Sequence, residues 1–451
     1  MISFAFYVAY TVGSLIYFGM SKINGGDILN KIGYKNGIAL GLVISAIGTL
    51  LFYPAAMNSS FGLMISGLFI VGLGFSLQQT AANPLAINMG DPKKGSQRLS
   101  LAGGINNIGT TIGPVIVSWA IFGSLAVGQK LENIESIKTP YLILGVAFLV
   151  VAVIFKLSSL PNEMETSEEK KSEMNIPVRQ EVRHRSEVSE TSSYSGDKKS
   201  ALAYPQLWLG MIGIFVYVGV EVSTASNLPE FMRVHLNTKT EEVAPYISLF
   251  WASLMIGRWT GAVGAFNLQK GTKQILNFFL PYAAFGVFLF VNFLANHNLT
   301  PFYVYSVLIV VLIIADIMSK GNPARQLVIF SSLGILALLI GIFADGMVSV
   351  YAFISVGLFC STLWPCIFTL SIAGLGKKTN EGASFLIMMI MGGGFISLFQ
   401  GWLSKDNLLG IQMSYFVGVA CFIYLGYYGW KAKQILKKQG IDYDASSGGS
   451  H

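Results

Sequence analysis

One carboxylic acid lies inside a long apolar stretch of this chain, where a charged group is costly. Glu221 follows the run Tyr217-Val-Gly-Val, about 21 Å along a helix that begins near Leu207. An ionisable side chain at such a depth usually has a function, either binding a proton or helping to coordinate sodium. Ser223 is a candidate to complete a cation site. The alternative is a structural role, with Glu221 paired to Arg258 or to backbone donors.

Amide side chains form a second group of polar residues in apolar runs. Gln79 and Asn83 precede Pro84 in one run, and Asn106 lies in the next. An unpaired amide in hydrocarbon is costly, so these side chains must face other helices or a wet cavity. Amides can both donate and accept hydrogen bonds, as sugar hydroxyls require. We therefore predict a site for a polar solute, with hydrogen bonding between helices as the alternative.

An aromatic residue and a further amide complete the predicted site. Trp364 lies mid-run, just before Pro365, and offers a flat face on which a pyranose ring can stack. The alternative is an anchor at the membrane interface. Asn227 lies in the same run as Glu221. The predicted substrate-binding residues are Gln79, Asn83, Asn106, Asn227 and Trp364.

The composition indicates a protein that crosses a membrane many times. Only 12% of the 451 residues are charged, 53% are hydrophobic, and the mean hydropathy is +0.59. Neither the three cysteines nor the four histidines have the spacing of a metal site or a disulfide framework. No hydrolase triad or nucleotide-binding loop is present, so we expect neither an enzyme nor a bound cofactor.

Apolar runs predict an all-α protein with about 13 membrane-spanning helices. The predicted spans are 2–20, 38–56, 61–89, 99–122, 141–156, 207–232, 246–267, 276–295, 302–319, 327–343, 348–375, 385–403 and 413–430. Between the fifth and sixth spans, the chain is rich in Glu, Lys, Ser and Arg. That composition is typical of a disordered linker between two halves.

Lysine and arginine placement gives the orientation. Most of the 30 basic residues fall in alternate loops, which include the linker and the C-terminal tail. This bias predicts that both are cytoplasmic, and it explains the net charge of +7 without a nucleic-acid partner. An odd number of spans places the N-terminus outside, so we expect that an initial helix is missing. The predicted organisation is an N-terminal bundle (1–160), a linker (161–200), a C-terminal bundle (201–435), and a tail with a tag remnant (436–451).

The first cytoplasmic turn carries a recognisable motif. Residues 26–35 resemble the signature Gly-x-Leu-x-Asp-Arg-x-Gly-x-Lys/Arg of the major facilitators, with Asn30 in place of the acid and Lys31 in place of the arginine. In that family the turn is a latch between helices. The resemblance assigns a latch role to Gly26, Asn30, Lys31 and Gly33, and the loss of the acid weakens its charge pair.

A longer resemblance covers most of both halves. Leu77-Gln-Gln-Thr-Ala-Ala-Asn-Pro84 and Arg98-Leu-Ser-Leu-Ala are similar to the fucose/glucose-galactose permease branch, the fucose–proton symporter family. The likeness continues through Ile256-Gly-Arg-Trp-Thr-Gly and Trp364-Pro-x-Ile-Phe. The resemblance implies the major facilitator fold, with two helical bundles, and marks 276–319 as an inserted helix pair. Gln79 stands where proton-coupled members carry an acid.

The resemblance implies uptake of a neutral monosaccharide, such as glucose, galactose or fucose, by alternating access. The coupling ion is a proton or sodium, and the setting is the lipid bilayer of a bacterial inner membrane. Two alternatives stay open: an exporter of amphipathic drugs or metabolites, and a membrane sensor that binds a solute without moving it. The sequence does not indicate an oligomeric state.

Overall fold

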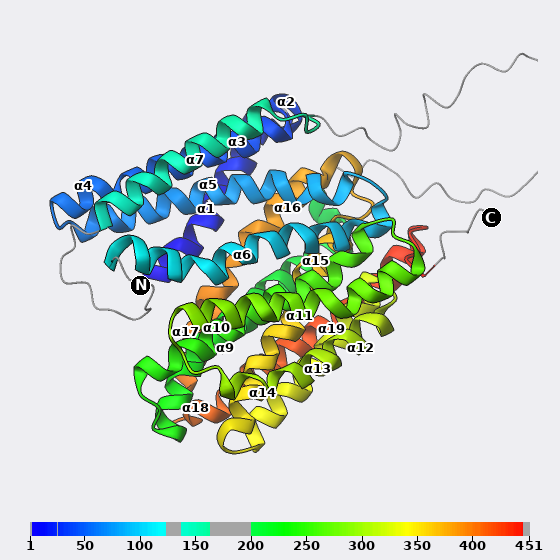
Figure 1. Ribbon diagram of the computed structural model, residues 1–451. Coiled ribbons are helices and arrows are strands. Elements are labelled where there is room, and N and C mark those ends of the chain that lie inside the picture. The colour runs from blue at the N-terminus through cyan, green and yellow to red at the C-terminus, as the bar shows by residue number, and fades with distance from the viewer. Residues whose placement is uncertain (1, 25, 123–136, 163–199, 445–451) are drawn as a thin grey trace, which may run out of the picture.

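The computed structural model describes residues 2–24, 26–122, 137–162 and 200–444. Within these ranges the secondary structure is helical and contains no strand (Figure 1). Ten helical segments are long and apolar enough to cross a membrane. The other three predicted spans, 2–20, 99–122 and 246–267, are also helical. The all-α prediction is therefore confirmed.

The N-terminal half, up to residue 160, packs its helices closely. It consists of α1 (Ile2–Ile23), α2 (Ile28–Ile32), α3 (Tyr34–Leu50), α4 (Phe52–Met57), α5 (Phe61–Asn88), α6 (Gly95–Phe122) and α7 (Lys138–Leu157). Glycines bring α3 and α5 together, because a Cβ at Gly74 would lie 2.5 Å from the carbonyl oxygen of Gly41. Small residues at such a crossing allow two backbones to approach, as is common between membrane helices.

The C-terminal half, from residue 201, contains more helices. They are α9 (Pro205–Leu236), α10 (Thr240–Ala262), α11 (Lys270–Leu294), α12 (Tyr305–Ser319), α13 (Pro323–Phe343), α14 (Gly346–Cys360), α15 (Leu363–Ile372), α16 (Thr379–Met388), α17 (Gly392–Leu403), α18 (Gly410–Met413) and α19 (Phe416–Lys438). Their buried side chains form one continuous apolar core, and a smaller core lies in the N-terminal half. This arrangement agrees with the two predicted bundles.

Two predicted spans are each divided into two helices. The predicted span 348–375 breaks between α14 and α15, because Pro365 has no N–H to donate to the carbonyl four residues earlier, that of Ser361. The predicted span 385–403 breaks at a short 3₁₀ segment, Met389–Met391, which precedes three glycines. Glycine is a weak helix former, so this sequence favours an interruption.

The predicted extra helix pair, 276–319, corresponds to α11 and α12, although α11 begins earlier, at Lys270. The Tyr282 hydroxyl donates a 3.1 Å hydrogen bond to the Ser306 carbonyl and ties the two together. The pair packs beside α10 and α13 (Figure 1). The predicted linker, apart from its ends, and the predicted tag remnant lie outside the described residues.

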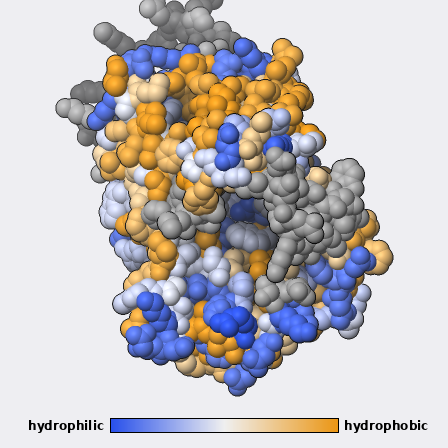
Figure 2. Space-filling model, turned by 90° about the vertical axis from the view of Figure 1, so that its left-hand side faces the viewer, coloured by the Kyte–Doolittle hydropathy of each residue, from blue (hydrophilic) through white to orange (hydrophobic). Residues whose placement is uncertain are grey.

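The halves meet along two main contacts. Helix α1 packs against α16 and the 3₁₀ segment, and α6 packs against α10 and α15. Figure 2 shows the end of the molecule that carries α4 and α18. A hollow enters near the centre of this face, with hydrophilic residues on its floor. At the opposite end from α4 and α18 lie α2 and the described C-terminus (Figure 1).

Candidate substrate and cation site

Glu221 lies near the middle of the 32-residue helix α9. The Tyr217 hydroxyl, one turn earlier, donates a hydrogen bond to its carboxylate. The ring of Tyr217 lies 6.1 Å from the ring of Trp364, at the start of α15. The structure therefore brings two predicted site residues, Glu221 and Trp364, together through Tyr217. Trp364 follows the break between α14 and α15 and is half-buried.

Arg258 fills the hydrogen-bonding gap that Pro365 creates. Its Nε donates a 3.1 Å hydrogen bond to the Ser361 carbonyl, the group that Pro365 leaves without a partner. Its Nη1 donates a 2.9 Å hydrogen bond to Oδ1 of Asn107 on α6. Arg258 also acts electrostatically on Glu221, although no ion pair joins the two among the described residues. One guanidinium thus connects the broken helix, the acid and the N-terminal half.

The contact between α6 and α10 extends beyond this residue. Trp259 Nε1 donates a 3.1 Å hydrogen bond to the Gly104 carbonyl, again from α10 to α6. Gly104 has no room for a side chain, since a Cβ there would lie 2.8 Å from the Trp259 ring. The sequence indicates Arg258 only as a possible partner of Glu221 and predicts no role for Asn107. The sequence does carry a signal for this role of Arg258. Pro365 leaves a buried carbonyl four residues earlier without a donor, and a basic residue in the middle of another span can supply one.

The predicted amides of the N-terminal half take three different positions. Gln79 Nε2 donates a 3.2 Å hydrogen bond to the hydroxyl of Tyr10 on α1. Asn83 lies one turn further along the same face of α5, and its side-chain nitrogen is buried without a hydrogen-bond partner in the described residues. Asn106 is exposed on α6. Gln79 and Asn83 thus lie one turn apart on the same face of α5, whereas Asn106 is exposed on another helix.

Two predicted residues on α9 do not share the face of Glu221. A helix turns about 100° per residue, so Ser223 and Asn227 point about 200° and 240° away from it. The Asn227 amide donates a 2.8 Å hydrogen bond to the Ser223 carbonyl within the same helix. The Ser223 hydroxyl is buried in the C-terminal half. The structure therefore separates both residues from Glu221.

The predicted latch turn takes part in a contact between the halves, at the end of the molecule that carries α2. Asn380 on α16 donates a 2.9 Å hydrogen bond to Oδ1 of Asn30, and its own oxygen accepts a 2.6 Å hydrogen bond from the Tyr34 hydroxyl. Neutral amides thus join the halves where the family signature has a charge pair. Lys31 bonds to the Asn24 carbonyl at 2.5 Å, within the turn.

The glycines of the latch turn are not equivalent. Gly33 has a φ of +86° and ψ of +152°, a conformation that is essentially restricted to glycine. A Cβ at Gly33 would also overlap the side chain of Asn162. Around Gly26, by contrast, a Cβ would meet only Lys31, at 3.8 Å. The close approach at Gly33 fixes the turn against the end of the N-terminal half.

Known proteins resemble this chain over nearly all of its length. A glucose/galactose transporter of Brucella abortus biovar 1 (strain 9-941) is 28% identical over 433 residues, which cover 95% of this chain and 84% of that protein. A putative glucose/galactose transporter of Helicobacter pylori (strain ATCC 700392 / 26695) is 28% identical over 444 residues, covering 94% and 89%. The L-fucose-proton symporter of Escherichia coli (strain K12) is 25% identical over 430 residues, covering 91% and 82%.

Among solved structures, the fold is similar to that of a Major Facilitator Superfamily transporter, FucP, in the outward conformation. The TM-score is 0.68 at 23% identity, over 96% of this chain and 89% of that one. Residues 1–311 match the family described as Major Facilitator Superfamily. Because this match covers more than half of the chain and the fold agrees, the protein belongs to the Major Facilitator Superfamily.

Proposed function

We propose that this protein imports a neutral hexose across the bacterial inner membrane by symport with a proton. Its relatives are named glucose/galactose transporters and L-fucose-proton symporters. The two halves would rock about a central site, as in other transporters of this architecture. The basic residues at the end that carries α2 support a cytoplasmic position for that end, with the hollow of Figure 2 facing outwards.

One observation carries the proposal: the acid Glu221 accepts a hydrogen bond from Tyr217, whose ring lies 6.1 Å from the ring of Trp364. This arrangement supports a site in which Glu221 binds the proton and Trp364 offers a flat aromatic surface to the sugar. The amides of Gln79 and Asn83, on the other half, supply hydrogen-bonding groups for sugar hydroxyls. A sugar held between the two halves would contact both and so respond to their movement.

The surroundings of Glu221 favour a proton over sodium. A proton requires only the carboxylate, whereas sodium requires several oxygens, often including those of unwound helix segments. Tyr217 is the one side chain hydrogen-bonded to Glu221 in the described residues, and Ser223 points elsewhere on α9. The relatives named as proton symporters support the same choice.

Arg258 offers a route from protonation to movement. When Glu221 is charged, it attracts the guanidinium; when it is protonated, that attraction disappears and Arg258 is held by Asn107 and Ser361 alone. The strength of the contact between α10 and α6 would therefore depend on the proton. Coupling follows if proton and sugar together stabilise one arrangement of the halves more than the other.

Transport in proteoliposomes tests the proposal. We expect Glu221→Gln to keep sugar exchange in counterflow and to lose accumulation driven by a pH gradient. Glu230→Gln is the control, because Glu230 lies on the same helix but is exposed and paired with Arg233. Uphill uptake by Glu221→Gln that equals that of the unaltered protein would contradict the role of Glu221.

Further transport measurements distinguish proton symport from sodium symport, export and solute sensing. Accumulation that requires sodium, and that is unaffected by collapse of the pH gradient, would replace the proton by sodium. Efflux of amphipathic compounds without sugar exchange would favour the exporter. Saturable sugar binding without counterflow would favour the sensor.

A further inference from the structure

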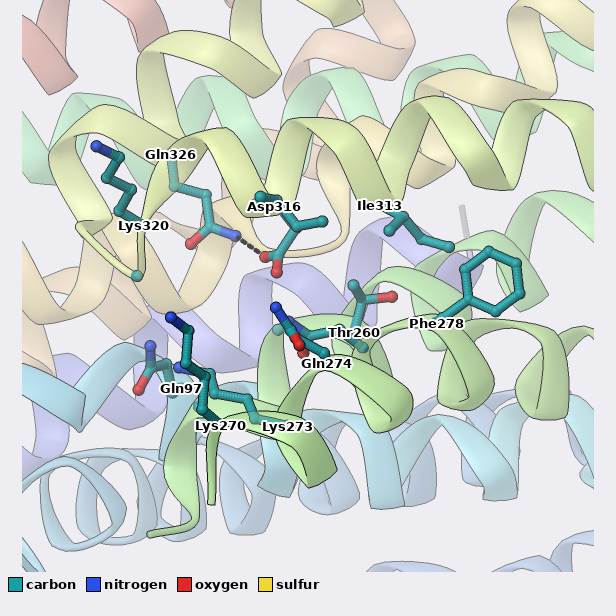
Figure 3. Close-up of a pocket in the computed structure, with 15 residues that line it drawn as sticks. Gln97, Thr260, Lys270, Lys273, Gln274, Phe278, Ile313, Asp316, Lys320 and Gln326 are labelled. Atoms are coloured by element: carbon teal, nitrogen blue, oxygen red, sulfur yellow. Dashed lines mark hydrogen bonds between the residues drawn. The ribbon is translucent and has the colours of Figure 1, made fainter. Parts of the chain in front are cut away.

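A cavity lined by both polar and apolar side chains lies away from the Glu221 site, at the end of the molecule that carries the latch. It has a volume of about 400 Å³ and lies between α6, α10 and the extra helix pair α11–α12, with α13 at one side. This volume is within the range of small-molecule sites in proteins. Figure 3 shows Phe278 and Ile313 at one end of the cavity and the basic and amide side chains towards the other.

Three lysine ammonium groups line this cavity, and that of Lys273 also acts electrostatically on the Asp316 carboxylate. Lys270 and Lys273 come from the first turn of α11, and Lys320 follows the last residue of α12. All three side chains are exposed. In the described part of the chain, none of them makes a side-chain hydrogen bond or an ion pair. Such a group of cations is suited to phosphate oxygens.

The cavity also carries side-chain oxygens that can accept hydrogen bonds. Asp316 Oδ1 accepts a 3.0 Å hydrogen bond from Gln326 Nε2, drawn as a dashed line in Figure 3. Its second oxygen has no such bond among the described residues. The side-chain oxygen of Gln97 is buried and likewise unpaired there. A buried acceptor is normally satisfied, so the Gln97 oxygen favours a ligand that brings hydroxyl groups. The half-buried Asp316 carboxylate offers a further acceptor beside it.

We propose that this cavity binds a phosphorylated polyol. The lysines hold the phosphate, and Asp316 and Gln97 accept hydrogen bonds from the hydroxyls. Two sources share this chemistry: a soluble sugar phosphate from the cytoplasm, and the phosphoglycerol headgroup of an anionic lipid. Basic pockets between helices on the cytoplasmic side are a common setting for lipid headgroups.

Occupation of the cavity has a consequence for transport, because its walls come from both halves. Gln97 belongs to α6 of the N-terminal half, whereas Lys273, Asp316 and Lys320 belong to the C-terminal half. A ligand that contacts both would stabilise the arrangement in which this end is closed. By linkage, it would oppose release of the carried solute at the same end. The cavity thus acts as a regulatory site, separate from the transport site.

Ligand-induced thermal stabilisation of the purified full chain, in an uncharged detergent, tests this proposal. The soluble probes are glucose 6-phosphate, glycerol 3-phosphate and inorganic phosphate. In a second arm, the chain is placed in phosphatidylcholine nanodiscs with and without phosphatidylglycerol. We expect saturable stabilisation by at least one polyol phosphate, at concentrations about tenfold or more below those that inorganic phosphate requires. Stabilisation by the soluble esters identifies a cytoplasmic ligand, and stabilisation by phosphatidylglycerol alone identifies a lipid.

Matched variants locate the effect. Lys273→Gln with Lys320→Gln should weaken binding by about tenfold or more, because charge-assisted hydrogen bonds are lost. Asp316→Asn should keep phosphate binding and lose the preference for the polyol ester. Lys377→Gln, an exposed lysine in another turn at the same end, is the control and should change nothing. Since all the substituted lysines are exposed, these variants should fold.

Two results would overturn the proposal. The first is an absence of saturable stabilisation by every phosphate and lipid tested. The second is an equal loss of binding in the Lys377→Gln control, which would mean that net charge alone attracts the ligand. Both measurements use binding and not transport, so their failure is distinguishable from failure of the Glu221 experiment.

Discussion

Arg258 on α10 and Asn107 on α6 are joined by a 2.9 Å hydrogen bond across the contact between the two halves. Asn107 is 4% exposed, whereas its neighbour Asn106 is exposed. The amide that joins α6 to α10 is therefore Asn107, and not Asn106, which the sequence indicates as a substrate-binding candidate. The same guanidinium bonds to the Ser361 carbonyl, so one side chain links α6, α10 and the break before α15.

Removal of this bond should shift the balance between conformations. In Asn107→Ala the charged donor on Arg258 loses its acceptor, which costs about 1.5–3 kcal/mol and therefore changes the equilibrium by about tenfold or more. The reporter is a Ser384→Cys substitution, since Ser384 is buried where α16 meets α1. Its thiol should then react faster with a reagent added from the cytoplasmic side. The native cysteines are all buried and give a low background.

Thr110→Val is the matched control for this measurement. Thr110 lies on the same helix, and its hydroxyl bonds only to the Asn107 carbonyl within α6. Reactivity of the Ser384 cysteine that rises equally in both variants would show that α6 has merely been loosened.

The latch should depend on Asn380 more than on the acid that the family signature carries. Asn380→Ala removes the bonds to Asn30 and Tyr34 together, so we expect faster labelling of the same Ser384 cysteine. Asn30→Asp should keep the latch closed, since a carboxylate also accepts a hydrogen bond from the Asn380 amide. Thr379→Ala is the control, because its hydroxyl bonds only to the carbonyl of Gly376 in the same turn. If the Ser384 thiol is labelled no faster in Asn380→Ala than in the unaltered background, these amides do not control opening of this end.

The two glycines of the first cytoplasmic turn should respond differently to alanine. At Gly33 the backbone conformation and the contact with Asn162 both exclude a side chain, so Gly33→Ala should destabilise the protein by about 1–3 kcal/mol. Gly26→Ala should be nearly neutral, since a Cβ there meets little. Thermal unfolding of the purified variants measures both effects. Equal melting temperatures would refute the structural role of Gly33.

Adjacent glutamines on α5 offer a test of the substrate site. The two side chains bond to different helices. Gln79 bonds to the hydroxyl of Tyr10 on α1, whereas Gln78 bonds to the Ser45 hydroxyl on α3 at 3.0 Å. Gln79→Ala should weaken hexose binding by about tenfold, the effect of one or two lost hydrogen bonds. Gln78→Ala should lower stability without changing hexose affinity. Equilibrium binding of radiolabelled sugar, with melting temperature recorded alongside, separates the two outcomes.

The sequence by itself determined that the chain is a bundle of membrane-spanning helices in two halves. The reason is that long apolar runs in lipid must satisfy their own backbone, which leaves the helix as the available form. It also predicts a functional role for Glu221 as an acid within a span, for Trp364 as a mid-span aromatic residue, and for Asn30 as part of a latch. These predictions follow from residue type and from position along a span.

The tertiary structure alone decided which side of each helix faces which neighbour. A shift of one residue turns a side chain by about 100°, so sequence position cannot separate Asn107 from Asn106, or Glu221 from Ser223. The partners of Arg258 are 103 and 151 residues away in the chain. The interruption at Pro365 creates an acceptor, but only the packing of α10 against α15 and α6 brings a guanidinium to it.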